Sequence, residues 1–245
     1  MLGTGRIPTI QGTAGNPGNP PSPGGRTPGS RRLTGCTGAG GAVRVAKVSD
    51  HRNHEWNHNV HYHPLVLRAL PERCESALDV GCGDGLLAAK LAARAGHVTG
   101  VDSSPEMIEL ARRRHPGVEF VHGDFMSWPH GRYDVVTSVA TIHHMAFDAA
   151  LSRMAAALRP GGTLVVLGVP RTSPADLPYE LLGVPYNRLM KALRREAQAD
   201  GMPARQPEMT WAEVRRRARR LLPGVRCRRH LLWRYSLVWR RPPGR

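Results

Sequence analysis

Short apolar segments alternate with amphipathic segments along residues 77–169 of the chain. Ser104 followed by Pro105 is a helix start signal, and Gly96 directly follows the helical pattern of Leu86–Ala95 as a stop signal. Strands separated by helices of this length form parallel sheets through right-handed β-α-β units. The pattern predicts a doubly wound α/β fold with strands at Ala77–Val80, Val98–Val101, Val118–Val121, Asp134–Val139 and Thr163–Val169.

The C-terminal third predicts a further helix and a closing hairpin. Thr210-Trp211-Ala212-Glu213 is a capping box, and apolar residues follow it at helical spacing. Apolar residues then fall on alternate positions between Val225 and Trp239, which predicts two β-strands. Residues 171–209 interrupt the alternation, as an insertion that would cover the carboxyl edge of the sheet, where α/β proteins bind ligands. Its amphipathic helix is predicted to bury Tyr186, Leu189, Met190 and Leu193.

Residues 1–42 differ in composition from the rest of the chain. The first 41 residues contain 12 Gly and 6 Pro and almost no apolar side chains. A segment that buries no apolar surface cannot offset the entropy lost on ordering, so we expect a disordered tail. The globular composition begins at Val43, and a translation start near this residue is an alternative interpretation of the same change.

The chain carries 35 Lys and Arg against 19 Asp and Glu, a formal charge of +16. A basic surface attracts polyanions, which makes nucleic acid a candidate partner. All but three of the basic residues are Arg, however, a skew that is also typical of G+C-rich genomes. No apolar run reaches the ~18–20 residues that span a bilayer, and no secretory signal is visible. The four cysteines lack C-x-x-C spacing. We therefore expect a cytoplasmic protein with no membrane partner and no disulfide framework.

The segment Asp79–Gly85 reads Asp-Val-Gly-Cys-Gly-Asp-Gly, follows the first predicted strand and opens a helix. Its glycines permit tight turning and close approach of a ligand to the backbone. The spacing is G-x-G-x-G, not the dinucleotide G-x-G-x-x-G, and the Asp79 carboxylate would repel a pyrophosphate but attract a cation. Asp102 ends the second strand, where a carboxylate can accept hydrogen bonds from ribose hydroxyls. Asp124 and Phe125 follow the third strand, where they suit an adenine ring.

Together these motifs resemble the class I S-adenosylmethionine-dependent methyltransferases, and in particular the subgroup called type 11 or type 12. The resemblance covers about residues 73–170 and is carried by Asp79–Gly85, Val98–Asp102, Gly123-Asp124, Tyr133–Met145 and Leu158–Val169. It implies a Rossmann-like, mostly parallel seven-stranded sheet with an antiparallel last strand, a methyltransferase domain over 73–245, and S-adenosyl-L-methionine as cofactor. The implied cofactor-binding residues are Asp79, Gly81, Cys82, Gly83, Asp102, Ser103, Asp124 and Phe125.

Within this set the resemblance implies separate roles. Asp79, Gly81 and Gly83 would line the amino-acid moiety of the cofactor, and Asp102 would hold the ribose. The adenine would lie against Asp124 and Phe125.

The family also has a lid before the first strand, which corresponds to residues 43–72, with the first helix, in this chain. The resemblance therefore implies Trp56, His58 and Tyr62 as substrate-pocket residues, joined by Tyr186 from the substrate cap at 171–209. Five histidines lie close together here, at positions 51, 54, 58, 61 and 63. Their spacing matches no zinc signature, so we predict no metal site.

His143 and His144 follow the fourth predicted strand and are the candidate catalytic residues. An imidazole with a pKa near ~6.5 suits a general base. The alternative is a purely structural loop, because positioning of the acceptor in line with the methyl group can by itself supply much of the rate.

The methyl acceptor is expected to be a small molecule, methylated on O, N or C. Amino-methylating nucleic-acid enzymes of this fold usually carry (Asp/Asn)-Pro-Pro-aromatic after the fourth strand, where this chain has Thr141-Ile142-His143-His144. The Asn-Pro-Pro at 19–21 is followed by Ser22, and no Pro-Cys dipeptide supplies the nucleophile of cytosine-5 methylation. An RNA methyltransferase, supported by the basic C-terminal segment alone, and a non-catalytic methyltransferase-like binding module are the alternatives.

Overall fold

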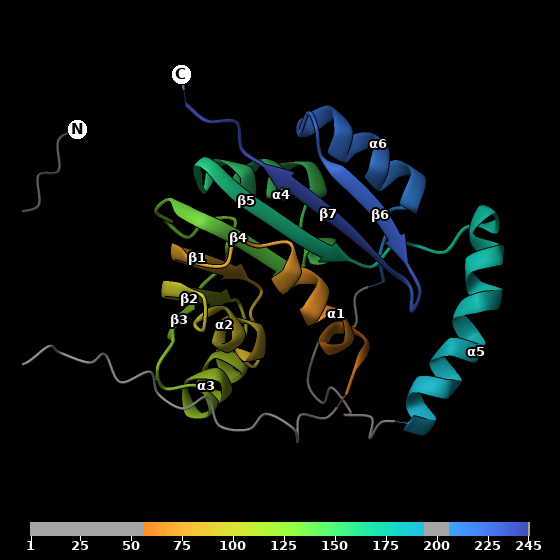
Figure 1. Cartoon of the computed structure of the whole chain (residues 1–245), viewed down its shortest axis with the longest axis horizontal. Helices are drawn as coiled ribbons and strands as arrows, with labels where there is room; N and C mark the ends of the chain where they lie inside the picture. The colour runs from red at the N-terminus through yellow and green to blue at the C-terminus, as the bar shows by residue number, and fades with distance from the viewer. Residues whose placement is uncertain (1–55, 194–205, 245) are drawn as a thin grey trace, which may run out of the picture. The chain divides into compact units, whose positions relative to one another are not determined.

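The computed structural model describes residues 56–193 and 206–244 (Figure 1). The predicted disordered tail, the alternative start near Val43, and His51 and His54 lie outside the described residues. None of the helices in the described ranges is long and apolar enough to span a bilayer.

A seven-stranded sheet with the strand order β3-β2-β1-β4-β5-β7-β6 organises the described chain. β7 alone runs antiparallel, and it pairs with β5 on one side and β6 on the other. This arrangement confirms the prediction of a Rossmann-like, mostly parallel sheet with an antiparallel last strand. The strands are β1 (Cys74–Val80), β2 (Ala95–Asp102), β3 (Glu119–His122), β4 (Tyr133–Val139), β5 (Leu158–Gly168), β6 (Arg226–His230) and β7 (Arg234–Arg240).

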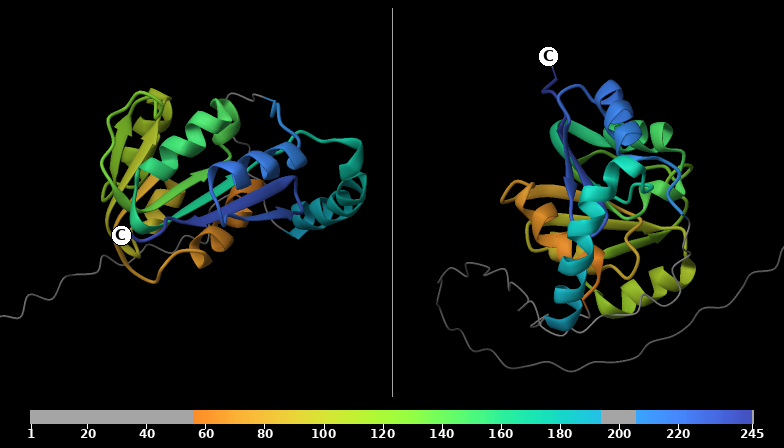
Figure 2. Two further views of the ribbon diagram at one scale, coloured as in Figure 1. Left: turned by 90° about the horizontal axis from the view of Figure 1, so that it is seen from above. Right: turned by 90° about the vertical axis from the view of Figure 1, so that its right-hand side faces the viewer.

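Helices cover both faces of the sheet (Figures 1 and 2). One face packs against α1 (His58–Arg68), α2 (Leu86–Leu91) and α3 (Pro105–Arg114), and the other against α4 (Phe147–Ala156) and α6 (Trp211–Leu221). Successive strand residues point to opposite faces, so Val165 faces the first helix layer while Leu164 and Val166 face the second. The remaining elements are two short 3₁₀ helices, η1 (Ile142–His144) and η2 (Pro174–Asp176), and α5 (Leu177–Leu193).

The start signals of two helices are confirmed at the level of single hydrogen bonds. The Ser104 hydroxyl caps α3 by accepting from the backbone N–H of Met107 at 3.1 Å. Thr210 and Glu213 form the predicted capping box of α6. Local sequence decides these positions because a cap satisfies backbone N–H groups that have no partner inside the helix.

The predicted helix Leu86–Ala95 is wrong at its C-terminal end. α2 stops at Leu91, and β2 begins at Ala95, so Gly96 is a strand residue and not a helix stop. The reason is tertiary: Ala95 pairs with Cys74 and His97 with Ser76 in the parallel β1–β2 ladder. Ladder hydrogen bonds outweigh the helical preference of this Ala-rich stretch, because tertiary context overrides intrinsic propensity.

The predicted closing hairpin is confirmed as β6 and β7, but its turn is unusual. Leu232 and Trp233 both adopt left-handed backbone conformations, with φ of 54° each. Such conformations are costly for side chains of this size and persist where surrounding packing holds them. Leu232 is fully buried against Trp56 and Tyr62, so the core of the N-terminal segment holds the turn.

The amphipathic helix predicted within residues 171–209 is present as α5, but its predicted apolar side is only partly buried. Met190 is buried and Tyr186 half-buried, whereas Leu189 and Leu193 are 54% and 70% exposed. α5 lies beyond the carboxyl ends of the parallel strands (Figure 1), where it contacts few other elements. Its remaining exposed large hydrophobic side chains are Leu177, Tyr179, Leu181, Leu182 and Val184.

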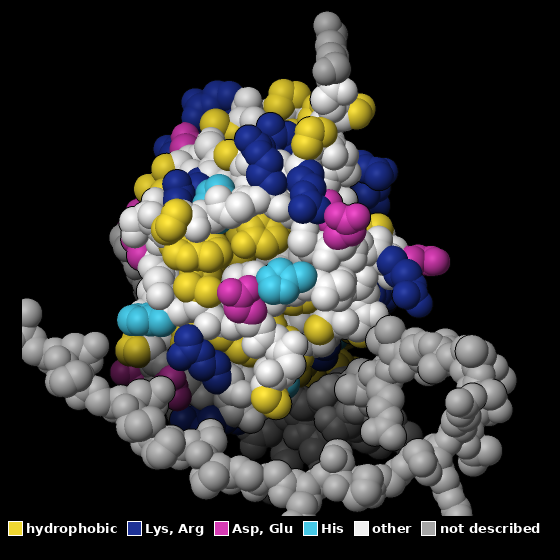
Figure 3. Space-filling model, turned by 90° about the vertical axis from the view of Figure 1, so that its left-hand side faces the viewer, with side chains coloured by type: hydrophobic (Ala, Val, Ile, Leu, Met, Phe, Trp, Pro, Cys, Tyr) yellow, Lys and Arg dark blue, Asp and Glu magenta, His cyan; other side chains and the backbone are white. Residues whose placement is uncertain are grey.

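The edge at which the parallel strands begin is shown in Figure 3, where Lys and Arg side chains gather above exposed hydrophobic ones. A hollow of about 1070 Å³ on this edge includes Arg73, Arg159, Arg226 and Arg240 in its lining. Arg159 is paired there with Asp134 and Glu75.

Gly85→Ala tests the packing between α2 and β3. Gly85 has φ +81°, and an added Cβ would lie 2.5 Å from the ring of Phe120. We expect the substitution to lower the free energy of unfolding by about 2–4 kcal/mol, the sum of left-handed strain and overpacking. Gly117→Ala, where the added Cβ meets nothing within 4 Å, is the control. Urea unfolding measures both, and equal midpoints would contradict the expectation.

Candidate functional site

A buried carboxylate lies at the carboxyl end of β1. Asp79 is 2% exposed, and the hydroxyl of Thr137 on β4 donates to its Oδ1 at 2.8 Å. Burial raises the pKa of Asp79 to about 7, against the effect of the Thr137 hydrogen bond, and the nearby carboxylates of Asp102 and Asp84 raise it further. An anion in this position gains stability from a cationic ligand, because desolvation has removed its other stabilisation.

The glycine loop after β1 is shaped by close contacts and one open space. Gly81 and Cys82 both donate backbone hydrogen bonds to the carbonyl of Val101, at 2.8 and 3.1 Å. Gly81 has φ +69°, and an added Cβ would lie 2.2 Å from the Thr141 side chain. Gly83 has φ +53°, but nothing lies within 4 Å of the position of its Cβ. The loop is therefore closed at Gly81 by Thr141, which follows β4, and open at Gly83, where a ligand can approach its backbone.

The thiol of Cys82 is buried beneath this loop, and its burial raises its pKa well above the usual range. The thiol is therefore protonated at neutral pH and contributes as a small apolar group.

Asp102 ties the end of β2 to the glycine loop. Its Oδ2 accepts from the Gly83 backbone N–H at 2.8 Å, and its Oδ1 accepts from the Ser104 backbone N–H at 2.9 Å. Each carboxylate oxygen has a second lone pair, so both can still accept from a ligand hydroxyl. Ser103 is exposed between the two anchored positions, and its carbonyl oxygen lies 3.2 Å from Nε2 of His122.

Asp124 and Phe125 lie after β3 in different environments. Asp124 is exposed and its Oδ1 accepts from the Met126 backbone N–H at 2.9 Å. Phe125 is 4% exposed, stacks on His130 with ring centroids 5.6 Å apart, and has the guanidinium of Arg153 above its ring. The Phe125 ring thus packs inside the protein, and contact between this ring and an adenine remains a prediction.

The segment between β4 and α4 connects the glycine loop to a second site. Ala140 has a left-handed φ of 53°, and its N–H donates to the Leu167 carbonyl at 2.7 Å. The next residue, Thr141, donates to the carbonyls of Gly81 and Val139. His143 and His144 follow in η1 with ring centroids 4.2 Å apart, and both are half-buried.

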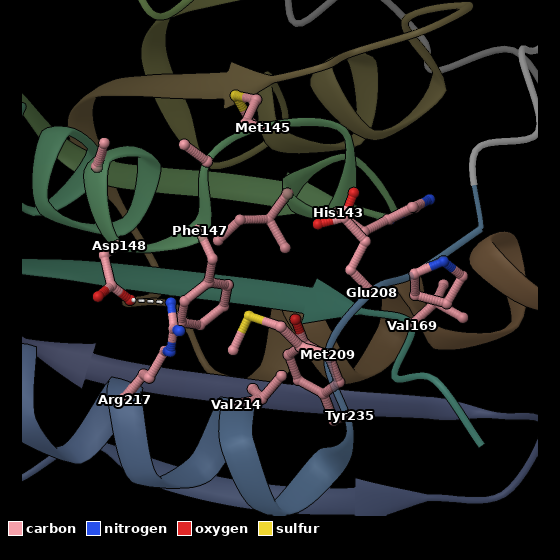
Figure 4. Close-up of a pocket in the computed structure, with 14 residues that line it drawn as sticks. His143, Met145, Phe147, Asp148, Val169, Glu208, Met209, Val214, Arg217 and Tyr235 are labelled. Atoms are coloured by element: carbon pink, nitrogen blue, oxygen red, sulfur yellow. Dashed lines mark hydrogen bonds and ion pairs between the residues drawn. The ribbon is translucent and has the colours of Figure 1, made fainter. Parts of the chain in front are cut away.

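A cavity of about 410 Å³ opens on the other side of this segment, between α4, α6 and the ends of β5 and β7 (Figure 4). We call it the α4–α6 cavity. His143 contributes to its lining, and His144 does not. Sequence reasoning missed the cavity because its walls come from segments far apart in the chain. The apolar side chains that line it include Ile142, Met145, Phe147, Val169, Met209 and Val214.

The predicted lid residues lie together, away from this cavity. Trp56 and Tyr62 are buried with Leu167 and Met190, and the Tyr62 hydroxyl donates to the carbonyl of Leu231. His58 Nε2 lies 2.9 Å from Asn187 Oδ1 of α5. Tyr186 lies beside α1, where its hydroxyl is 3.5 Å from His61 Nε2.

None of the predicted lid side chains lines the α4–α6 cavity. Of the predicted cap at 171–209, the described part that lines it is Pro207–Met209.

The histidines of α1 point to separate partners. His58 faces Asn187, His61 faces Tyr186, and Nδ1 of His63 lies 3.1 Å from the ammonium of Lys90. Within residues 56–193 and 206–244, no group of three His, Cys, Asp or Glu could hold a metal ion.

Asp79→Asn tests the desolvation of the buried carboxylate. The pKa of Asp79 is about 7 in the folded chain and that of an Asp in an unfolded chain is ~3.9. Between these values the folded state binds more protons, so the contribution of Asp79 to stability falls as the pH rises through this window. We expect the variant without ligand to lose this dependence and to melt above wild type at about pH 8. Equal melting temperatures of the two proteins at about pH 8 would contradict the raised pKa of Asp79.

Comparisons with known proteins agree with this architecture. A family model described as a methyltransferase domain matches residues 77–162. An uncharacterized methyltransferase of Mycobacterium tuberculosis is 34% identical over 192 residues, covering 76% of this chain and 98% of the relative. A Streptomyces fradiae protein named dTDP-3-amino-3,6-dideoxy-alpha-D-glucopyranose N,N-dimethyltransferase is 41% identical over 108 residues, 42% of each chain.

A solved structure supports the fold. The N-methyltransferase NodS of Bradyrhizobium japonicum, in complex with S-adenosyl-L-homocysteine, matches with a TM-score of 0.50 and 16% identity over 75% of this chain and 87% of its own. The strand order, the glycine loop and the near-complete coverage of the mycobacterial relative lead to one conclusion: the chain belongs to the class I S-adenosylmethionine-dependent methyltransferases.

Proposed function

We propose that the chain transfers the methyl group of S-adenosylmethionine to a small-molecule acceptor bound in the α4–α6 cavity. The observation that carries this proposal is the cavity itself, whose volume of about 410 Å³ and apolar lining suit a small ligand. Thr141 contacts the glycine loop, and its neighbours Ile142 and His143 line the cavity. The cofactor loop and the cavity are therefore separated by one short segment.

The residues at the glycine loop fit the cofactor. Asp79 offers a desolvated carboxylate for the ammonium group of its methionine part, and Gly83 offers open space beside the backbone. Asp102 keeps acceptor capacity for the ribose hydroxyls. We assign Asp124 and Phe125 to the adenine end, and Gly81, Cys82 and Ser103 to the loop that frames the cofactor. The bound sulfonium supplies an activated methyl group.

The protein's part in the reaction is then to position the acceptor and to exclude water. The apolar lining of the α4–α6 cavity keeps water away from the acceptor, and its walls orient the acceptor in line with the methyl group. His143 is the candidate general base, because its side chain lines the cavity. His144 does not line it, and we assign this residue a structural role in η1.

The predicted lid residues and Tyr186 of the predicted cap do not line the cavity, and we propose that they act indirectly, by holding α5 in place. Trp56, His58, Tyr62 and Tyr186 join α1 to α5, so they hold the cap helix beside the carboxyl edge of the sheet. Pro207–Met209, at the end of the predicted cap, contribute to the cavity wall.

RNA is the less favoured acceptor. The large basic hollow lies at the edge where the parallel strands begin, and the glycine loop lies where they end. β1 alone has 7 residues, which at ~3.3 Å per residue separates the two edges by about 20 Å. The nucleotides that contact this hollow would therefore not themselves receive the methyl group.

The acceptor class is tested with labelled cofactor. The full chain is incubated with S-adenosylmethionine labelled in the methyl group, first with a metabolite extract below a few kilodaltons and then with total RNA. We expect label in the small-molecule fraction. Saturable labelling of RNA together with none in metabolites would overturn the proposal, whereas RNA binding that vanishes at moderate salt without labelling is electrostatic.

Asp102→Ala tests the cofactor assignment. The substitution removes the ribose acceptor and leaves the Gly83 and Ser104 N–H groups without their partner. We expect binding of S-adenosylhomocysteine to weaken by roughly 1.5–3 kcal/mol, the scale of hydrogen bonds to a charged group. Glu109→Ala, which removes an exposed carboxylate of α3, is the control in the same calorimetric titration. An unchanged dissociation constant would place the ribose elsewhere.

His143→Ala tests general-base catalysis, with His144→Ala as its matched control. We expect His143→Ala to lower kcat by ~10²–10⁴-fold at unchanged cofactor affinity, as for loss of a proton acceptor. His144→Ala is expected to change kcat by less than about tenfold, because that ring does not line the cavity. A drop below tenfold at both positions would assign catalysis to positioning alone.

A further inference from the structure

The α4–α6 cavity contains one hydroxyl group from the sheet itself. Tyr235, at the start of β7, is 1% exposed and lines the cavity. In Figure 4 its phenolic oxygen points toward the space beside Met209. This residue has no part in the catalytic steps derived above.

The position of the Tyr235 ring is sterically fixed. Tyr235 pairs with Gly168 across the β5–β7 ladder, and a Cβ on Gly168 would lie 2.2 Å from both Cζ and Oη of Tyr235. The ring therefore lies across the backbone of β5, in space that only glycine leaves open. Trp211 of α6 packs against it with ring centroids 5.7 Å apart. A side chain held on both sides is positioned in advance for a ligand.

The Tyr235 hydroxyl makes no hydrogen bond to another residue of the described ranges, and its oxygen is not among the fully enclosed polar atoms, so it borders the cavity that Tyr235 lines. Burial alone raises its pKa, with no hydrogen bond or nearby charge as an opposing cause, so the phenol is neutral over the physiological range. A hydroxyl that borders a cavity without a protein partner can be satisfied by a ligand or by water in that cavity. Its O–H is available as a donor.

Charged or ionisable side chains lie at the two ends of the α4–α6 cavity and not in its middle. Figure 4 shows Asp148 and Arg217 at one end and His143 and Glu208 at the other. Asp148 is neutralised by ion pairs with Arg217 and Arg220, at 3.5 and 2.8 Å. Between the ends, the surroundings of the Tyr235 hydroxyl are apolar, and an ion there would lose hydration without gaining a partner.

We propose that Tyr235 is a specificity-determining residue that donates a hydrogen bond to the acceptor, and that the acceptor is an uncharged, largely apolar molecule with a carbonyl or hydroxyl oxygen at its buried end. This inference rests on the proposed function, since it takes the cavity as the acceptor site. The apolar part of the acceptor would lie against Phe147, Val169 and Val214, and the atom to be methylated would lie toward Ile142 and His143, which line the same cavity.

Binding of three small probes tests this assignment without any methyl transfer. The probes are acetophenone, isopropylbenzene and benzoate, which share a ring and a similar outline. Acetophenone carries a neutral oxygen that can accept a hydrogen bond, isopropylbenzene has no acceptor, and benzoate carries a negative charge. Each is titrated by ligand-observed NMR into the full chain saturated with S-adenosylhomocysteine. The variant is Tyr235→Phe. The control is Ser138→Ala, which also removes a buried hydroxyl without a partner, but one outside the cavity lining.

We expect acetophenone to bind more tightly than the other two probes to wild type and to Ser138→Ala. Tyr235→Phe should weaken acetophenone by about three- to tenfold, leave isopropylbenzene unchanged, and leave the melting temperature nearly unchanged, since the hydroxyl makes no hydrogen bond to another described residue.

Equal acetophenone affinity in wild type and Tyr235→Phe, or tighter binding of benzoate, would overturn the inference. Failure of the proposed function looks different. In that case the labelled methyl group does not enter the small-molecule fraction, while acetophenone still binds in a Tyr235-dependent manner.

Discussion

The arrangement at the carboxyl edge of this sheet depends on the buried carboxylate of Asp79. Asp79 is held inside the protein by one hydrogen bond from Thr137, which its register position on β4 places directly beside it. Two residues after Asp79 the chain reaches Gly81, and Thr141 of the β4–α4 segment packs against the glycine loop at this position. The pairing of β1 with β4 thus sets both the charge and the shape of the cofactor loop, and the segment that reaches the cavity begins from it.

Most of the fold could be predicted because its signals are local. Short apolar segments predicted the strands, and Ser104 and Thr210 predicted helix starts, since a cap needs only residues within one turn. The prediction failed where distant residues compete. Ala95 belongs to β2 because Cys74 is available to pair with it, and no local pattern reports that partner.

The candidate site was predictable to the same extent. Asp79, Asp102 and the glycines could be named because they follow strands in a familiar order, and the structure brings them together at one edge. Thr137 and Tyr235 could not. Thr137 is 58 residues from Asp79, and Tyr235 gains its position from Gly168 across an antiparallel ladder. The position of each of these two residues in the site can be recognised only once the strand order is known.

The left-handed conformation of Ala140 has a consequence for how such an enzyme can diverge. Because the chain turns there, Thr141 faces the glycine loop while Ile142 and His143 face the α4–α6 cavity. Outside the β4–α4 segment, the rest of the cavity lining comes from α4, α6, β7, Val169 and Pro207–Met209, which supply none of the glycine loop's hydrogen bonds. Under the proposed function, substitutions in this lining would exchange one acceptor for another while the cofactor loop is inherited intact, so new substrates would become accessible through a series of variants that each remain active methyltransferases.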